Sequence, residues 1–151
     1  VAKDPCTVIV DFAHTPNALE KALSTVRRTT RGKLVHIFGS AGLRDLTKRP
    51  VMGKASAKYA DSIILTEEDY RTEDVEKIMD AIQDGIPKSK KVVRFPDRRD
   101  AIRFALRSAK KGDTVMITGK GHEKSLCRGT VEYPWSDQET VKTLLKERAT
   151  V

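Results

Sequence analysis

The chain has 151 residues, enough for one domain that buries about two-thirds of the surface its unfolded form would expose. Hydrophobic residues make up 38% and charged residues 33%, as in an ordinary globular domain. No apolar run approaches the ~20 residues that span a bilayer, so we expect that the chain is not a membrane protein. The formal charge of +8 favours anionic partners, but aromatic residues at 5% argue against a surface that stacks nucleic-acid bases.

Two cysteines, Cys6 and Cys127, lie far apart and lack the spacing of metal ligands. This pattern is typical of free thiols in a reducing compartment. The first residues, VAKDPC, show no basic segment followed by an apolar one, so we expect no signal peptide. The expected location is the cytoplasm.

Short apolar segments rich in β-branched residues alternate with helical patterns along the chain. The segments are bounded and almost continuously apolar, which predicts buried strands. They cover residues 7–11, 33–39, 61–66, 91–95 and 113–119. Apolar residues recur at helical spacing between them, beginning at Leu19, Val75 and Ile102, and Pro50 suits the first turn of a further helix.

The end of the chain shows two further patterns. Residues 123–133 predict a short hairpin with its turn at Arg128 and Gly129. Ser136 precedes Glu139 by three residues, a capping-box pattern that opens a last helix. The regular alternation predicts an α/β fold, a three-layer Rossmann-like domain with a mostly parallel sheet of about six strands flanked by helices. No repeat or linker divides the chain, so residues 1–151 are expected to form one domain.

Polar residues follow the predicted strands, at the edge where open α/β sheets bind ligands. Asp11 and His14 follow the first strand in DFAHTP, and GSAGLRDLTKRP, residues 39–50, follows the second. Glycines there let the backbone approach a ligand, and the basic residues precede a helix N-terminus, which favours anions. The segment is neither a GxxxxGK[ST] phosphate loop nor a GxGxxG dinucleotide fingerprint.

GKGHE, residues 119–123, follows the fifth strand and is a weak signal by itself, because a turn with exposed charges also explains it. His14 and His122 suggest metal ligation or acid–base work. The chain has only three histidines and no cysteine pair near them, so no metal site is expected.

Six segments, taken together and in order, resemble the C-terminal domain of the Mur ligase family over nearly the whole chain. They are DFAHTPNALEKAL, FGSAGLRDLTKRPVMGKASAKYADSIILT, EEDYRTEDVEKI, DRRDAIRFAL, ITGKGHE and YPWSDQETV. The chain is most similar to the members that add the third residue of the peptidoglycan stem peptide. The resemblance implies an ATP-dependent, ADP-forming acid–amino-acid ligase of cell-wall synthesis.

The family reaction uses ATP and Mg²⁺ to phosphorylate the carboxylate of a UDP-N-acetylmuramyl peptide. The amino group of an incoming amino acid then attacks the acyl phosphate. The family's GTNGKT loop, magnesium ligands and modified lysine belong to a central domain, and an N-terminal domain holds the UDP-sugar. The resemblance therefore implies that residues 1–151 are one domain of a three-domain ligase, inactive without those two partners.

The resemblance also implies binding residues, but no catalytic residue and no metal ligand, in this chain. Contacts with ATP are expected from Asp11, His14, Lys48 and Arg49. Contacts with the incoming amino acid are expected from Arg44, Asp69, Arg71, Gly119 and Glu123. An arginine suits the carboxylate of a zwitterion and a glutamate its ammonium group. A structural alternative is that Asp11 caps the next helix, a task that Thr15 could also perform.

One departure concerns specificity. Family members specific for meso-diaminopimelate carry DNPR, where this chain has Glu68, Asp69, Tyr70 and Arg71. The retained arginine favours a substrate with a second carboxylate, whereas the missing proline and asparagine leave the amino acid open. Leu43 also stands where the family commonly has an aspartate.

Two other function classes fit the element order or the charge. A stand-alone α/β module that binds a nucleotide or anion without ligase activity is the main alternative. A receiver domain is disfavoured because only Asp11 stands where a receiver has paired acids. A nucleic-acid binder is motivated by the charge, and salt-dependent binding to random DNA would distinguish it.

Overall fold

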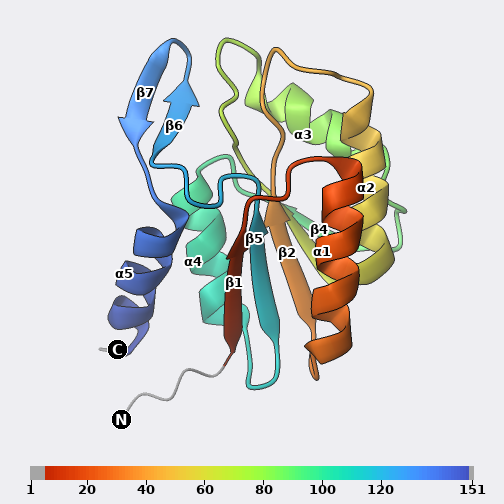
Figure 1. Cartoon of the computed structure of the whole chain (residues 1–151), viewed down its shortest axis with the longest axis vertical. Helices are drawn as coiled ribbons and strands as arrows, with labels where there is room; N and C mark the ends of the chain where they lie inside the picture. The colour runs from red at the N-terminus through yellow and green to blue at the C-terminus, as the bar shows by residue number, and fades with distance from the viewer. Residues whose placement is uncertain (1–5, 150–151) are drawn as a thin grey trace.

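The computed structural model describes residues 6–149, which form one twisted sheet with helices on both faces (Figure 1). The five sheet strands are all parallel, in the spatial order β1-β5-β2-β3-β4. They are β1 (Thr7–Asp11), β2 (Leu34–Phe38), β3 (Ser62–Leu65), β4 (Lys91–Arg94) and β5 (Thr114–Thr118). The predicted parallel α/β fold is confirmed, with five strands in the sheet where about six were expected.

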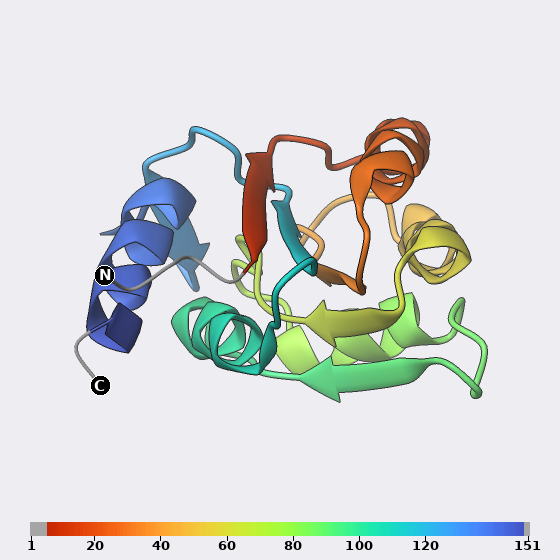
Figure 2. The ribbon, with the colours of Figure 1, turned by 90° about the horizontal axis from the view of Figure 1, so that it is seen from below.

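Five helices flank the sheet in two layers (Figure 2). They are α1 (Pro16–Thr29), α2 (Lys48–Tyr59), α3 (Val75–Gln83), α4 (Arg98–Ser108) and α5 (Asp137–Ala149). Because side chains alternate along a strand, Leu34 and Phe38 of β2 pack against α1, α2 and α3, whereas Ile37 packs against α4 and α5. No helix in the described range 6–149 has the length and apolarity needed to cross a bilayer.

The remaining two strands, β6 (Ser125–Arg128) and β7 (Val131–Pro134), form the predicted hairpin beside the sheet. Gly129 has φ +63° in its turn, a conformation that glycine adopts without strain. Ser136 Oγ then accepts a hydrogen bond from Glu139 N at the start of α5, as the capping pattern predicts. At α1 the cap is Thr15, whose Oγ1 accepts from Ala18 N, so the structure gives that task to Thr15.

The strand order determines where loops gather. The loops after β1, β2 and β3 lead to helices on one face, whereas the chain after β5 continues through the hairpin to α5 on the other. β5 lies between β1 and β2, so loops that diverge to opposite faces start from neighbouring strands. Such a topological switch point is where open α/β sheets bind ligands. We call the loops after β1, β2, β3 and β5 the carboxyl edge.

A buried ion pair connects this edge to α5. Arg98, the first residue of α4, is fully buried and donates to both carboxylate oxygens of Asp137 at 2.8 and 2.9 Å. It also donates to the backbone oxygens of Glu67 and Thr118, each at 3.0 Å. Burial works to raise the pKa of Asp137, but the guanidinium outweighs it and holds that pKa below its ordinary value.

Replacing Asp137 with alanine is predicted to destabilise the domain by roughly 3–5 kcal/mol, because it leaves the Arg98 cation buried without its counter-ion. Chemical denaturation measures the change. Asp100→Ala is the control, because Asp100 pairs with Arg103 at the surface, where an ion pair contributes at most about 1 kcal/mol. Equal losses of unfolding free energy in the two variants would contradict the role of Asp137 as the counter-ion of buried Arg98.

His36 is a second buried polar group, in the middle of β2. Its ring nitrogens lie 2.7 Å from Ser56 Oγ and 2.9 Å from Thr118 Oγ1, and the ring stacks on Phe38. Burial, with the Arg98 charge as a smaller cause, lowers the pKa of His36 to about 3. The histidine is therefore a neutral hydrogen-bonding residue of the core.

His36 should make stability fall on acidification. Between pH 6.5 and about 3, His36 is protonated in the unfolded state but neutral in the folded state. The free energy of unfolding therefore decreases as the pH falls through this window. On going from about pH 6.5 to about pH 5, wild type should lose up to about 2 kcal/mol more than His36→Gln. Urea unfolding at both pH values measures the two free energies. Equal losses in wild type and His36→Gln would contradict a role of His36 in the acid sensitivity.

Candidate functional site

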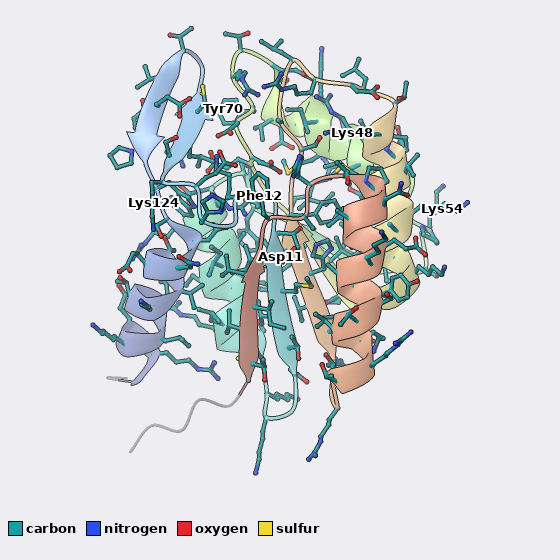
Figure 3. All side chains as sticks on the ribbon, in the orientation of Figure 1. Asp11, Phe12, Lys48, Lys54, Tyr70 and Lys124 are labelled. Carbon is teal, nitrogen blue, oxygen red and sulfur yellow. The ribbon has the colours of Figure 1, made fainter. Side chains whose placement is uncertain are left out.

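The residues expected to bind ligands all lie at the carboxyl edge, although they come from separate parts of the sequence. Asp11 ends β1, and the others lie in the loops after β1, β2, β3 and β5 or in the first turn of α2. They are Asp11, His14, Arg44, Lys48, Arg49, Asp69, Arg71, Gly119 and Glu123. Figure 3 labels Asp11, Lys48 and Tyr70 along this edge, whereas Lys54 lies on the outer side of α2.

The β1 side of the edge presents an aromatic surface. Asp11 Oδ2 accepts a hydrogen bond from Ala13 N at 2.9 Å, which fixes the turn. Phe12, labelled in Figure 3, is 43% exposed. Its ring centroid lies 4.7 Å from that of His14 and 5.7 Å from that of His122. A carboxylate in the same segment as exposed rings suits a ligand with a polar part and a planar part.

The start of α2 is suited to an anion. Thr47 precedes the helix, but its hydroxyl bonds to Asp45 and does not cap the first turn. Arg49 N donates to Leu46 O at 3.3 Å and Pro50 has no N–H, so this helix start attracts an anion through the positive end of the helix dipole and the side chain of Lys48, the first helical residue. Arg44 is exposed in the preceding loop and has no hydrogen bond or ion pair among residues 6–149.

The side chain of Arg49 binds other residues of this chain. It is only 2% exposed, and it donates to both oxygens of Glu73 at 2.5 and 2.9 Å and to Ala41 O at 3.1 Å. The pair keeps the pKa of Glu73 below its ordinary value. The predicted ATP contact of Arg49 stays a prediction, and its contacts in this structure connect the loop after β2 to the loop after β3.

These two loops approach each other closely. A Cβ on Gly42 would lie 2.0 Å from Tyr70 O, so only glycine fits there. Arg71 Nη1 donates to Gly42 O at 3.0 Å and to Asp69 O at 3.3 Å. Its Nε and Nη2 make no hydrogen bond within the described residues and remain available to a ligand.

Asp69 joins three segments of the chain. Its carboxylate accepts from Lys120 Nζ at 2.9 and 3.0 Å and from Cys127 N of the hairpin at 2.8 Å. Lys120 is only 1% exposed and lies 3.6 Å from Glu123 Oε2. Because these bonds occupy the Asp69 carboxylate, its predicted contact with an amino acid stays a prediction.

Glu68 has the opposite environment. It is 7% exposed, yet its carboxylate has no hydrogen-bond or ion-pair partner among residues 6–149. A Cβ on Gly119, which has φ +109°, would lie 2.5 Å from Glu68 Oε2, so the glycine makes room for this carboxylate. Burial raises the pKa of Glu68 to about 7 against the opposing charges of Arg98 and Lys120.

The sequence did not single out Glu68, Glu73 or Lys120. GKGHE was considered as a family motif, with a turn of exposed charges as the alternative, but Lys120 itself was given no role, and Glu68 was considered only as a departure from a motif. A signal existed for Glu68, since Glu67, Glu68 and Asp69 follow the predicted third strand directly, at the edge that binds ligands. Within the described residues, no three histidine, cysteine or acidic side chains are grouped so as to hold a metal ion.

The chain is similar to known ligases over nearly its full length. Residues 1–121 match the family described as Mur ligase, glutamate ligase domain. A UDP-N-acetylmuramoyl-L-alanyl-D-glutamate–2,6-diaminopimelate ligase of Aquifex aeolicus is 50% identical over 145 residues, which are 96% of this chain and 30% of the relative. A UDP-N-acetylmuramyl-tripeptide synthetase of a Roseiflexus species is 42% identical over 151 residues, covering 97% of this chain and 30% of the relative.

A solved structure gives the same result. A UDP-N-acetylmuramoyl-L-alanyl-D-glutamate–2,6-diaminopimelate ligase superposes with a TM-score of 0.93 and 36% identity, covering 99% of this chain and 31% of that one. The chain thus spans about 30% of the length of the curated relatives that it matches. Because the family match covers most of its residues, the chain belongs to the Mur ligase family.

Proposed function

We propose that this chain is the C-terminal domain, residues 1–151, of a three-domain ATP-dependent ligase that adds an amino acid to a UDP-N-acetylmuramyl peptide in the cytoplasm. The observation that carries the proposal is the convergence of Arg44, Arg71 and Glu123 on the edge that also holds Asp11 and Lys48. Cations and carboxylates on one edge suit a zwitterion next to a polyphosphate.

The proposed reaction forms a peptide bond in two steps. ATP transfers its terminal phosphoryl group to the carboxylate of the UDP-N-acetylmuramyl peptide, which gives an acyl phosphate and ADP. The amine of the incoming amino acid then attacks the acyl carbon, and inorganic phosphate leaves. The contribution of the protein is mostly positioning and neutralisation of charge.

We assign the nucleotide to the β1 and α2 side of the edge. Asp11 accepts a hydrogen bond from the ribose, with His14 beside it, and Lys48 with the N-terminus of α2 faces the phosphates. The ligands of Mg²⁺ come from the central domain, as the family resemblance implies. Arg49 shapes the loop that presents Lys48.

The incoming amino acid is assigned to the β3 and β5 side of the edge. Arg44 binds its carboxylate, Glu123 its ammonium group, and Gly119 lets it approach the backbone. The free donors of Arg71 suit a second carboxylate, which favours meso-diaminopimelate over lysine. Asp69 contributes by holding Lys120 and the hairpin in place.

The rest of the site is proposed to come from the central and N-terminal domains of the same ligase. In this arrangement the domain closes over the central domain and completes the site from two sides. Closure would exclude water, which otherwise hydrolyses an acyl phosphate.

The chain alone should therefore form no peptide bond. Incubated with ATP, Mg²⁺, UDP-N-acetylmuramyl dipeptide and meso-diaminopimelate, it should release no ADP above the buffer control, because the phosphate-binding loop is elsewhere. The intact ligase should release ADP and form the tripeptide, as measured by coupled ADP assay and mass spectrometry. Ligation by the chain alone would overturn the assignment as one domain of a larger active site.

Arg44→Ala in the intact ligase should raise the KM for the amino acid roughly 10- to 100-fold, because a charge-assisted hydrogen-bonded pair contributes about 1.5–3 kcal/mol. The KM for ATP should change little. Arg107→Ala is the matched control, since Arg107 is exposed on α4 away from the edge. An unchanged KM for the amino acid in Arg44→Ala would rule out the proposed role of Arg44.

A further inference from the structure

The hairpin β6–β7 stands against the loop that carries Arg71 (Figure 1). All of β7 is exposed, so β6 is the strand that faces the domain. Gly129 N donates to Arg71 O at 2.7 Å, where Arg71 and Arg128 form a parallel bridge. Cys127 N donates to Asp69 Oδ1 at 2.8 Å. The hairpin backbone therefore binds the loop after β3 at two positions.

The loop depends on such contacts because its backbone conformation is unfavourable. The φ angles of Asp69 and Arg71 are 35° and 55°, a region in which residues other than glycine stay only when the surrounding structure holds them. Arg71 Nη1 is bound to Gly42 O and to Asp69 O, which leaves Nε and Nη2 as the donors available to a ligand. The direction of these donors is therefore set by the groups that hold the loop.

Arg128 fixes the hairpin in its place. Its Nε and Nη2 donate to Oε1 and Oε2 of Glu67, each at 2.7 Å, in the two-bonded geometry that suits a guanidinium and a carboxylate. Glu67 is only 2% exposed, and its Oε2 also accepts from Arg98 N at the start of α4. The Arg128 Cζ lies 5.5 Å from the ring centroid of Tyr133 in β7, within range of a cation–π attraction. The guanidinium thus joins both strands of the hairpin to the body of the domain.

We propose that Arg128 is a positioning residue for the amino-acid site, an inference that rests on the function proposed above. Its pair with Glu67 fixes the hairpin, and the hairpin backbone holds the loop at Asp69 and Arg71. The loop then presents the two free donors of Arg71 to the second carboxylate of the incoming amino acid. Arg128 therefore acts on the choice of amino acid and not on the chemical step.

The test compares two amino acids in the intact ligase. Lysine differs from meso-diaminopimelate by the absence of the second carboxylate, so wild type should have the higher kcat/KM with meso-diaminopimelate. In Arg128→Ala this kcat/KM should fall roughly 10-fold, mainly through a raised KM, because a displaced Arg71 loses part of a charge-assisted contact. The kcat/KM for lysine and the KM for ATP should not change, which also shows that the variant is folded.

A double variant tests whether Arg128 acts through Arg71. Arg71→Ala removes the donors, so adding Arg128→Ala should lower the kcat/KM for meso-diaminopimelate no further. Arg128→Lys keeps a cation opposite Glu67 but not the two-bonded geometry, and should recover part of the loss. Arg103→Ala is the matched control and should behave as wild type. The Arg103 side chain is 33% exposed, against 32% for Arg128, and it pairs with Asp100 on α4.

Four results would overturn the inference while leaving the proposed function intact. One is an unchanged kcat/KM for meso-diaminopimelate in Arg128→Ala. Another is an equal loss with both amino acids, which would assign Arg128 a general structural role. The third is a further loss when Arg128→Ala is added to Arg71→Ala. The fourth is wild type that ligates lysine as well as meso-diaminopimelate, because Arg71 would then select nothing.

Failure of the proposed function has a different signature. With ATP, Mg²⁺ and UDP-N-acetylmuramyl dipeptide, wild type would form no peptide product with either amino acid. In that case the inference fails together with the function on which it rests.

Discussion

The arrangement of the carboxyl edge depends on one buried cation. The guanidinium of Arg98 binds the last backbone oxygens of the β3 and β5 regions, at Glu67 and Thr118, and is neutralised by Asp137 of α5. Trp135 donates to the same aspartate at 2.8 Å, which links the hairpin exit to the pair. A desolvated ion pair adds little stability compared with apolar packing. Its contribution here is geometric, since it sets the ends of two non-neighbouring strands relative to the last helix.

Three consecutive acids in the loop after β3 have three different environments in consequence. Glu67 is paired with Arg128 and Asp69 is bound by Lys120, whereas Glu68 makes no hydrogen bond or ion pair within residues 6–149 and feels Arg98 and Lys120 only at a longer distance. Direct contacts with cations stabilise the charged form of a carboxylate, whereas burial without a donor favours its neutral form. The same chemical group is thus a structural anchor at two positions and lacks a direct contact with a cation at the one between them.

The loops that complete the edge adopt an uncommon backbone conformation. The backbone φ angles of Leu43, Asp69 and Arg71 are 57°, 35° and 55°, values that residues other than glycine rarely adopt. Contacts between the loops hold them, including the bond from Gly42 N to Asp69 O and that from Leu43 N to Glu73 Oε1. Strained residues of this kind concentrate at binding sites, where surrounding contacts fix the conformation. Arg44, which follows Leu43 and is proposed to bind the amino acid, is presented to solvent by this strained loop.

The sequence by itself determined the elements, the fold class and the loops that carry polar residues, because periodicity, capping residues such as Thr15 and parallel-strand topology are local or nearly local properties. It also located candidates such as Asp11 and Arg44 through their position after strands. Only the tertiary structure decided which of these side chains remain available, since Arg49 and Asp69 are occupied by partners 24 and 51 residues away along the chain. It alone distinguished Glu68 from its acidic neighbours, because the pKa of a carboxylate depends on burial and on distant cations that adjacent residues in a sequence do not reveal.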